Sequence, residues 1–255
     1  MPNLSNKVAI VTGCASGIGA ATVRRLRADG AMVLGTDVQA EAGRSLAEAV
    51  GAAFARQDVA DRDGWPAIVA RAVEEYGRLD ILVNNAAVLG GASIAEVSDA
   101  QWDRVIAVNL TGTMAGCRAA IAAMIRNPGG PKGSIINIAS TTAMAPLPND
   151  VGYSASKGAV RVLSKSVATW CAQQGYEIRC NTVIPGATET GILEAAEAAT
   201  PGLKAAVAAT SPMNRLGQPA ETAAAIAFLA SDECPFMTGA ELLVDGGALS
   251  IHPGF

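Results

Sequence analysis

Short apolar runs alternate with longer helical patterns along the chain, and this alternation constrains the fold more than any other sequence feature. Residues 7–11 predict a buried strand, and residues 18–28 have the apolar spacing of a helix that Gly30 ends. Further strands are expected at 31–36, 52–56, 79–83, 134–138, 177–184 and 241–244, and further helices at 41–50, 61–76, 99–126, 153–174 and 219–231. This order implies right-handed crossovers and an α/β fold whose mostly parallel sheet carries helices on both faces.

The chain shows no linker, internal repeat or low-complexity segment that would divide it. Residues 1–255 are therefore expected to form one domain. Hydrophobic residues make up 50% of the chain but aromatic residues only 4%, so Ala, Val, Ile and Leu must build the core.

Composition also excludes several kinds of partner. The net charge is −4 and no basic cluster occurs, so nucleic acid is not an expected partner. The five cysteines are scattered without a C-x-x-C pair, which favours free thiols in a reducing cytoplasm and no metal site. No apolar run approaches the roughly 20 residues of a membrane span, and the N-terminus lacks a signal peptide, so a cytoplasmic location is expected.

A glycine-rich turn separates the first strand from the first helix, at Thr12-Gly13-Cys14-Ala15-Ser16-Gly17-Ile18-Gly19. Glycine permits a tight turn and lets backbone N–H groups approach a pyrophosphate, while the helix N-terminus adds a partial positive charge. The sequence therefore predicts a dinucleotide contact at Gly13, Ser16, Gly17, Ile18 and Gly19. The alternative is a tight connection that binds no ligand.

An acidic residue, Asp37, follows the second strand. A carboxylate there accepts hydrogen bonds from the hydroxyls of an adenosine ribose and repels a 2′-phosphate. Ser16 and Val38 offer that phosphate no basic side chain, so NAD is predicted in preference to NADP. The alternative is that Asp37 only caps the next helix. Asp58 and Val59, after the third strand, are expected to accept from the adenine amino group, with a simple turn as the alternative.

Tyr153 and Lys157 are four residues apart in a predicted helix and therefore share one face. A lysine beside a phenol lowers its pKa from the ordinary value near ~10, and a positive nicotinamide ring would add to that effect. The tyrosinate is then a general base for an alcohol proton, and in reverse the phenol donates that proton. The alternative is an exposed helix pair without a catalytic role.

Other polar residues occur near the ends of strands. Ser140 follows the fifth strand, and a hydroxyl at this end of an open parallel sheet points into the ligand crevice. Asn84-Asn85-Ala86 ends the fourth strand, and Pro185-Gly186 ends the sixth with Thr188 just beyond. Asn109 interrupts a helix, where asparagine is locally unfavourable, and this favours a functional role.

These pieces together resemble the short-chain dehydrogenase/reductase family. The matching motifs are T-G-x-x-x-G-I-G (Thr12 to Gly19), N-N-A (Asn84 to Ala86), Asn109, Ser140, Y-x-x-x-K (Tyr153, Lys157), P-G-x-x-x-T (Pro185, Gly186, Thr190) and V-D-G-G (Val244 to Gly247). The resemblance covers essentially the whole chain, in the family's order and spacing. Ala87 departs from it, because many members carry glycine there; the added methyl would lie beside the cofactor.

The resemblance implies a Rossmann-type, doubly wound, seven-stranded parallel sheet of order 3-2-1-4-5-6-7. Tyr153 would be the acid/base, Lys157 would bind the nicotinamide ribose and lower the Tyr153 pKa, and Ser140 would hold the substrate oxygen. Asn109 would support a relay water through its backbone. The cofactor site would comprise Gly13, Ser16, Gly17, Ile18, Gly19, Asp37, Val38, Asp58, Val59, Asn85, Ala86, Ala87, Tyr153, Lys157, Pro185, Gly186 and Thr188.

The resemblance also implies an assembly. In this family the two long helices, here 99–126 and 153–174, usually form a four-helix dimer interface. The helix at 219–231 and the terminal residues 245–255 usually complete a tetramer, so a homotetramer or homodimer is expected. The single histidine, His252, is expected at the surface or an interface rather than on a metal.

Residues 171–181 look most like those of bacterial secondary-alcohol, alicyclic-alcohol and 3β/17β-hydroxysteroid dehydrogenases. The substrate site is expected to comprise Ala92, Ser140, Thr142, Leu147, Tyr153 and Gly186, under a lid at about 188–214. Lys204 is the one basic residue in the Ala-rich part of that lid, which favours a small, neutral, apolar alcohol or ketone. The alternatives are a 3-oxoacyl-carrier-protein reductase and an inactive NAD-binding scaffold or sensor.

Overall fold

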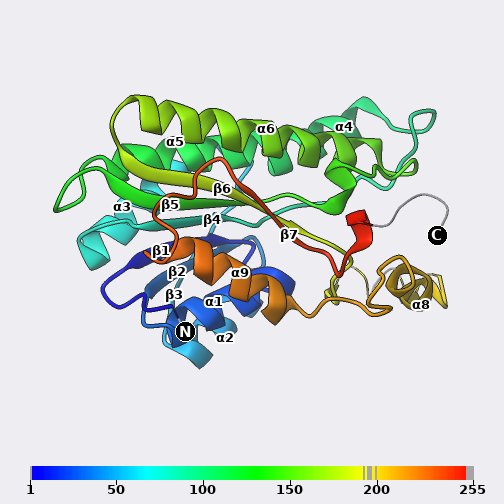
Figure 1. The fold of residues 1–255 in the computed structure, drawn as a ribbon, viewed down its shortest axis with the longest axis horizontal. Helices are drawn as coiled ribbons and strands as arrows, with labels where there is room; N and C mark the ends of the chain where they lie inside the picture. The colour runs from blue at the N-terminus through cyan, green and yellow to red at the C-terminus, as the bar shows by residue number, and fades with distance from the viewer. Residues whose placement is uncertain (1, 192, 194–196, 199, 251–255) are drawn as a thin grey trace.

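The computed structural model describes residues 2–191, 193, 197–198 and 200–250. Seven strands form one parallel sheet in the order β3-β2-β1-β4-β5-β6-β7 (Figure 1), which confirms the fold class and strand order predicted above. The strands are β1 (Val8–Thr12), β2 (Met32–Asp37), β3 (Ala53–Arg56), β4 (Ile81–Asn84), β5 (Lys132–Ile138), β6 (Glu177–Pro185) and β7 (Glu241–Val244).

Helices cover both faces of this sheet (Figure 1). One face carries α1 (Gly17–Ala28), α2 (Ala40–Val50) and α9 (Pro219–Ala230), and the other carries α3 (Trp65–Tyr76), α4 (Asp99–Ile106), α5 (Gly112–Met124) and α6 (Val151–Gln173). A short helix, α8 (Leu203–Ala208), lies beyond the carboxyl ends of the strands (Figure 1).

Each helical layer encloses its own apolar core. Under α1 and α9 the core contains Val23, Leu26 and Ile226, together with one face of the central strands. Under α3 and α5 it contains Trp65 and Met124, both almost fully buried. The central strands β1 and β4 are buried along their whole length, as expected for a parallel sheet covered on both sides.

Most elements lie within two residues of the expected bounds, and the larger differences concern α3, the helix at 99–126 and α8. The third helix begins at Trp65 rather than Asp61, because the Asp61 carboxylate accepts the backbone N–H groups of Asp63 and Gly64 in a turn ahead of it. The predicted helix at 99–126 contains a π-helical segment, Ala107–Thr111, between α4 and α5. Helix α8 was not predicted, because its six residues are too short for an apolar period to show.

The continuous helical run Asp99–Met124 is long and apolar enough to cross a membrane by composition. Here its second half, α5, packs against α3 and strands β4 and β5 instead. A Cβ at Gly116 would lie 2.7 Å from the Trp65 ring, and one at Gly112 would lie 2.8 Å from the Val59 carbonyl oxygen. This close approach explains why small, apolar residues recur along the helix.

Candidate active site

The glycine-rich turn has the shape that only glycine allows at its tightest points. Gly13 and Gly17 have φ angles of +65° and +52°. A Cβ at Gly13 would lie 2.8 Å from the Ala86 Cα atom, and a Cβ at Gly19 would collide with the Gly13 carbonyl oxygen. The turn is therefore pressed against the end of β4 on one side and against helix α1 on the other.

The N-terminus of α1 is chemically available to an anion. Ser16 is its N-cap residue, but among the described residues its side chain makes no capping hydrogen bond, and the first turn holds no acidic residue. The N–H groups of that turn and the helix dipole thus favour a negative group such as a pyrophosphate. Ile18, in the same turn, packs against the core beneath α1.

Asp37 ends β2 and ties that strand to the turn. Its Oδ2 atom accepts the Ala15 N–H at 2.9 Å, and its Oδ1 atom accepts the Gln39 N–H at 2.9 Å. The N-cap of α2 is Gln39, so the alternative of Asp37 as a helix cap is wrong. Each carboxylate oxygen has a second lone pair, which leaves Asp37 able to accept ribose hydroxyls.

The three neighbouring positions differ in exposure. Val38, directly after β2, is exposed. Asp58, after β3, is also exposed, and its carboxylate accepts the Ala60 N–H. Val59 is buried, and its carbonyl accepts the Trp65 indole N–H at 3.1 Å. Val59 therefore also serves packing, a role that its place in the sequence did not indicate.

Asn85 and Thr12 join the ends of β4 and β1. The Asn85 amide donates to the carbonyl oxygens of Thr12 at 2.9 Å and Gly13 at 3.1 Å. The Thr12 hydroxyl accepts the backbone N–H groups of Asn85 and Ala86. These bonds hold Asn85, Ala86 and the turn in one rigid unit, which can present backbone groups to a cofactor.

A buried polar network lies beneath this unit. The Asn84 amide donates to Asn137 Oδ1 at 2.8 Å, and the Asn137 amide donates to the Ser164 hydroxyl at 2.9 Å. The network links β4, β5 and α6, so it fixes three elements that carry site residues. The roles of Asn137 and Ser164 were missed in the sequence, where a polar residue within an apolar run was the one available signal.

Asn109 is fully buried in the π-helical segment. Its side chain accepts the Val88 N–H at 2.8 Å and donates to the Val88 carbonyl at 2.9 Å, so it clamps the loop after β4. The same amide donates to the Ser156 hydroxyl, which in turn donates to the Tyr153 carbonyl at 2.7 Å. Asn109 is thereby connected to the helical turn that carries Tyr153.

Ser140 and Tyr153 come together at the carboxyl end of β5. Ser140 is the N-cap of a short 3₁₀ helix, Thr141–Ala143, and its hydroxyl accepts the Thr142 N–H at 3.2 Å. A hydrogen bond between Ser140 and the Tyr153 phenol favours the ionised phenol. The Thr142 hydroxyl lies nearby and is buried without a partner among the described residues.

Lys157 lies one helical turn after Tyr153 and is almost fully buried. Its ammonium group donates to the Ile138 carbonyl at 2.7 Å and lies 5.6 Å from the centroid of the Tyr153 ring. Burial lowers the pKa of Lys157 to about 8, because the surroundings disfavour its charge. The pair is therefore not an exposed one.

The protonation of Tyr153 differs from the sequence expectation. Its pKa is raised above the ordinary value by burial and by the carboxylate of Asp150, and lowered in part by the hydrogen bond with Ser140. The lowering expected from Lys157 is not found in the protein alone. The Lys157 ammonium donates to the Ile138 carbonyl, and because its pKa is about 8 it loses its charge before a phenol with a raised pKa ionises.

The substrate-side residues lie on three separate segments. Ala92 is buried in the loop after β4, while Leu147 is exposed and its N–H donates to the Ser154 hydroxyl. Gly186 follows β6, where a Cβ would lie 2.8 Å from the Asp245 Cα atom. The Thr188 hydroxyl donates to the Gly186 carbonyl at 3.0 Å.

The predicted lid at 188–214 begins beside the phosphate turn. A Cβ at Gly17 would lie 3.1 Å from Thr190 Cγ2. The lid also contains α8, but residues 192, 194–196 and 199 lie outside the described part of the chain, as does His252.

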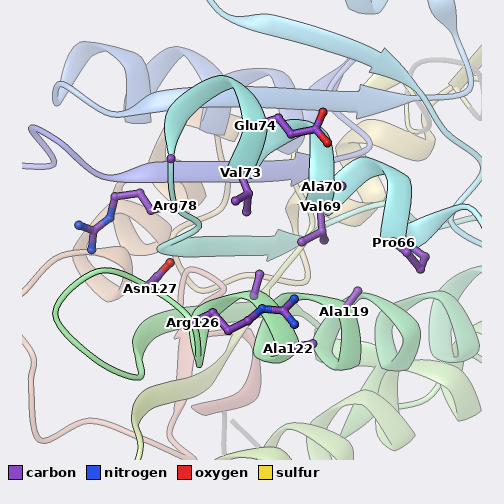
Figure 2. A pocket seen from close by; sticks show the side chains of 12 residues that line it. Pro66, Val69, Ala70, Val73, Glu74, Arg78, Ala119, Ala122, Arg126 and Asn127 are labelled. Atoms are coloured by element: carbon purple, nitrogen blue, oxygen red, sulfur yellow. The ribbon is translucent and has the colours of Figure 1, made fainter.

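A pocket of about 360 Å³ lies elsewhere, between α3 and α5 (Figure 2). Apolar side chains such as Val69 and Val73 line it, with Glu74 and Arg126 among its polar residues (Figure 2). None of the predicted site residues borders it.

Comparison with known proteins agrees with this geometry. A family model described as enoyl-(acyl carrier protein) reductase matches residues 13–248. The 3beta-hydroxysteroid dehydrogenase 1 of Eggerthella lenta is 40% identical over 263 residues, covering 99% of this chain and 97% of that protein. The cis-4-hydroxycyclohexanecarboxylate dehydrogenase of Sinomonas cyclohexanicum is 40% identical, covering 97% and 98% respectively. The NADP-dependent (R)-specific alcohol dehydrogenase of Lentilactobacillus kefiri is 37% identical, covering 96% and 97%.

The chain belongs to the short-chain dehydrogenase/reductase family. It is an oxidoreductase of the alcohol dehydrogenase type, and its family binds a nicotinamide cofactor. The uncapped N-terminus of α1 and the glycine turn suit the pyrophosphate of such a cofactor, and Asp37 suits its adenosine ribose.

Proposed function

We propose that the protein interconverts neutral, apolar secondary alcohols and their ketones, of alicyclic or steroid-like shape, with NAD as cofactor. The observation that carries the reaction is the convergence of Ser140, Tyr153 and Lys157 at the carboxyl end of β5. The substrate class is supported by the names of two relatives, a hydroxysteroid and a hydroxycyclohexanecarboxylate dehydrogenase.

Three residues perform the proton chemistry in this proposal. Tyr153 removes the hydroxyl proton of the alcohol, or donates it to the carbonyl oxygen in the reverse reaction. Ser140 donates a hydrogen bond to that oxygen and holds it beside the phenol. Lys157 supports the ionised phenol once the cofactor ribose orients it, and the bound nicotinamide supplies the hydride acceptor. Asn109 connects the π-helical segment to the backbone of Tyr153, because its amide donates to the Ser156 hydroxyl and that hydroxyl donates to the Tyr153 carbonyl.

The preference for NAD rests on Asp37. A carboxylate at the end of β2 accepts the ribose hydroxyls of NAD and repels the 2′-phosphate of NADP. The relative from Lentilactobacillus kefiri is named as NADP-dependent, so cofactor preference varies within the range of similarity seen here. Neither Ser16 nor Val38 provides this chain with a cation for the phosphate.

A second candidate function is the reduction of 3-oxoacyl-carrier-protein substrates. It is favoured by the description of the matching family model, which names an acyl-carrier-protein reductase. Asp37 speaks against it, because such reductases normally use NADPH and a carboxylate at the end of β2 repels the 2′-phosphate of that cofactor. An inactive NAD-binding scaffold or sensor is the third candidate.

The experiment measures turnover of a panel of substrates through the change in NADH absorbance. Cyclic secondary alcohols and hydroxysteroids are offered with oxidised NAD or NADP, and a 3-oxoacyl thioester is offered with the reduced form of each cofactor. The proposal predicts turnover of cyclic alcohols or steroids with NAD preferred. A strong preference for the thioester supports the second candidate, and no turnover of any compound supports the scaffold.

We further propose a cytoplasmic homotetramer or homodimer that acts on a small molecule, with neither nucleic acid nor membrane as a partner. The free cysteines support the location, the absence of a basic cluster supports the exclusion of nucleic acid, and the assembly rests on the family resemblance. Sedimentation of the purified protein tests the assembly.

A further inference from the structure

A buried carboxylate caps the helix that carries Tyr153. Asp150 is 4% exposed and immediately precedes α6. Its Oδ1 atom accepts the Tyr153 N–H at 3.1 Å. Serine or asparagine caps a helix about as well, without the cost of burying a charge. The carboxylate therefore calls for a role beyond the cap.

The second set of contacts made by Asp150 reaches the loop between β4 and α4. The Gly90 N–H points at the carboxylate, 3.1 Å from Oδ2 and 3.3 Å from Oδ1. A Cβ at Gly90 would lie 2.9 Å from Asp150 Oδ1, so glycine is what allows this approach. The Val151 N–H donates to the Ala92 carbonyl at 3.2 Å and forms a second link. The loop that carries Ala92 is thus fixed to the start of α6.

The charges around Tyr153 are few. Asp150 and Lys157 face it from α6 and its cap, with Lys157 directed at the Ile138 carbonyl. The connection after β5 contributes the neutral Ser140. The π-helical segment contributes the neutral Asn109, through Ser156, and the loop after β4 contributes backbone groups. Burial raises the pKa of Tyr153 above its ordinary value, and among the described residues Asp150 is the negative charge that raises it further.

We propose that Asp150 is a positioning residue that fixes the loop 85–98 against the N-terminus of α6, and so sets the orientation of Tyr153 and the shape of the substrate site beside Ala92. This inference rests on the proposed dehydrogenase function. A loop held in this way preforms the site, which suits a rigid cyclic substrate because less ordering is needed on binding.

Three variants separate the two effects of Asp150. Asp150→Asn removes the charge and keeps one oxygen, which at the Oδ1 position can accept both the Tyr153 N–H (3.1 Å) and the Gly90 N–H (3.3 Å). Gly90→Ala keeps the charge but strains the tether, because its Cβ would crowd Asp150 and would also lie 3.3 Å from Val105 Cγ2. Asp150→Ala loses both.

The first readout needs no turnover. The ultraviolet absorbance of tyrosinate is titrated without added nucleotide, and the curve of Tyr153→Phe is subtracted to remove the other tyrosines. Asp150→Asn should move the Tyr153 titration to lower pH, and Gly90→Ala should not. Hydrogen exchange at the Gly90 amide should stay slow in Asp150→Asn and become fast in Asp150→Ala. The inference is overturned if the Tyr153 titration does not move in Asp150→Asn and the exchange of the Gly90 amide does not become faster in Asp150→Ala.

The second readout is kinetic, with a cyclic alcohol that the wild type turns over. Asp150→Asn should shift the pH profile of kcat to lower pH with little change in KM. Gly90→Ala should raise KM roughly fivefold, the factor that corresponds to about one hydrogen bond, without shifting the profile. If Asp150→Ala keeps the wild-type KM and profile, Asp150 is only a cap. If the wild type itself turns over no alcohol or ketone, the proposed function fails, and the titration and exchange data still decide whether Asp150 holds the loop.

Discussion

Replacing Lys157 by methionine tests the electrostatics of the site through stability rather than activity. Lys157 is 3% exposed, and burial lowers its pKa from 10.5 to about 8. The folded protein therefore disfavours the ammonium form, and the unfolded chain binds more protons between about pH 8 and 10.5. The penalty for keeping Lys157 charged is fully present below pH 8 and is relieved as the pH rises through this window.

The magnitude follows from the two pKa values. Their separation corresponds to a penalty of roughly 3 kcal/mol at neutral pH. By about pH 10 most of it is gone, so the free energy of unfolding of the wild type should rise by roughly 2 kcal/mol relative to Lys157→Met between pH 7 and pH 10. The hydrogen bond to the Ile138 carbonyl affects the absolute difference at any single pH, which makes the change with pH the informative quantity.

The assay is urea unfolding of both proteins at several pH values, without nucleotide and with a reductant. Tyr153 and the cysteines titrate in both proteins and cancel in the difference. Lys165→Met, which removes a half-exposed lysine of the same helix, is the matched control. If the difference between the wild type and Lys157→Met changes with pH no more than in the control, the reasoning about the buried ammonium is refuted.

Three further predictions concern other parts of the site. Asp37→Asn keeps an acceptor for Ala15 but removes the charge, so kcat/KM with NADP should rise at least tenfold relative to NAD; an unchanged cofactor ratio contradicts the role given to Asp37. Cys14 should resist alkylation at pH 8 until the protein unfolds, because burial first and then Asp37 raise its pKa to about 12; mass spectrometry of the native protein checks this, and rapid labelling counts against it. Asn84→Ala should lower the free energy of unfolding by about 1–3 kcal/mol, because Asn137 loses its 2.8 Å partner; an unchanged urea midpoint contradicts it.

The sheet and the phosphate turn could be predicted because their signals are local. An apolar run of strand length, or a glycine where the chain must turn, is visible within a few residues. A local signal can also mislead. Asp61 resembles a helix cap in the sequence, but in the structure it caps a separate turn and α3 begins at Trp65.

The parts of the site that escaped prediction depend on contacts between distant segments. Asp150 meets Gly90 across 60 positions, and Asn84 meets Asn137 across 53. Neither contact leaves a periodic trace in the sequence. The burial of Lys157, which lowers its pKa, and its bond to the Ile138 carbonyl at the end of β5 likewise depend on segments distant in the sequence.

The most direct test of the central claim is oxidation of a cyclic secondary alcohol by the wild type and by Tyr153→Phe, measured as NADH formation. The account predicts turnover by the wild type with NAD preferred over NADP. It also predicts a loss of at least about a thousandfold in kcat for Tyr153→Phe, with NADH binding nearly unchanged. Comparable turnover by Tyr153→Phe would contradict the assignment of Tyr153 as the acid/base of this site.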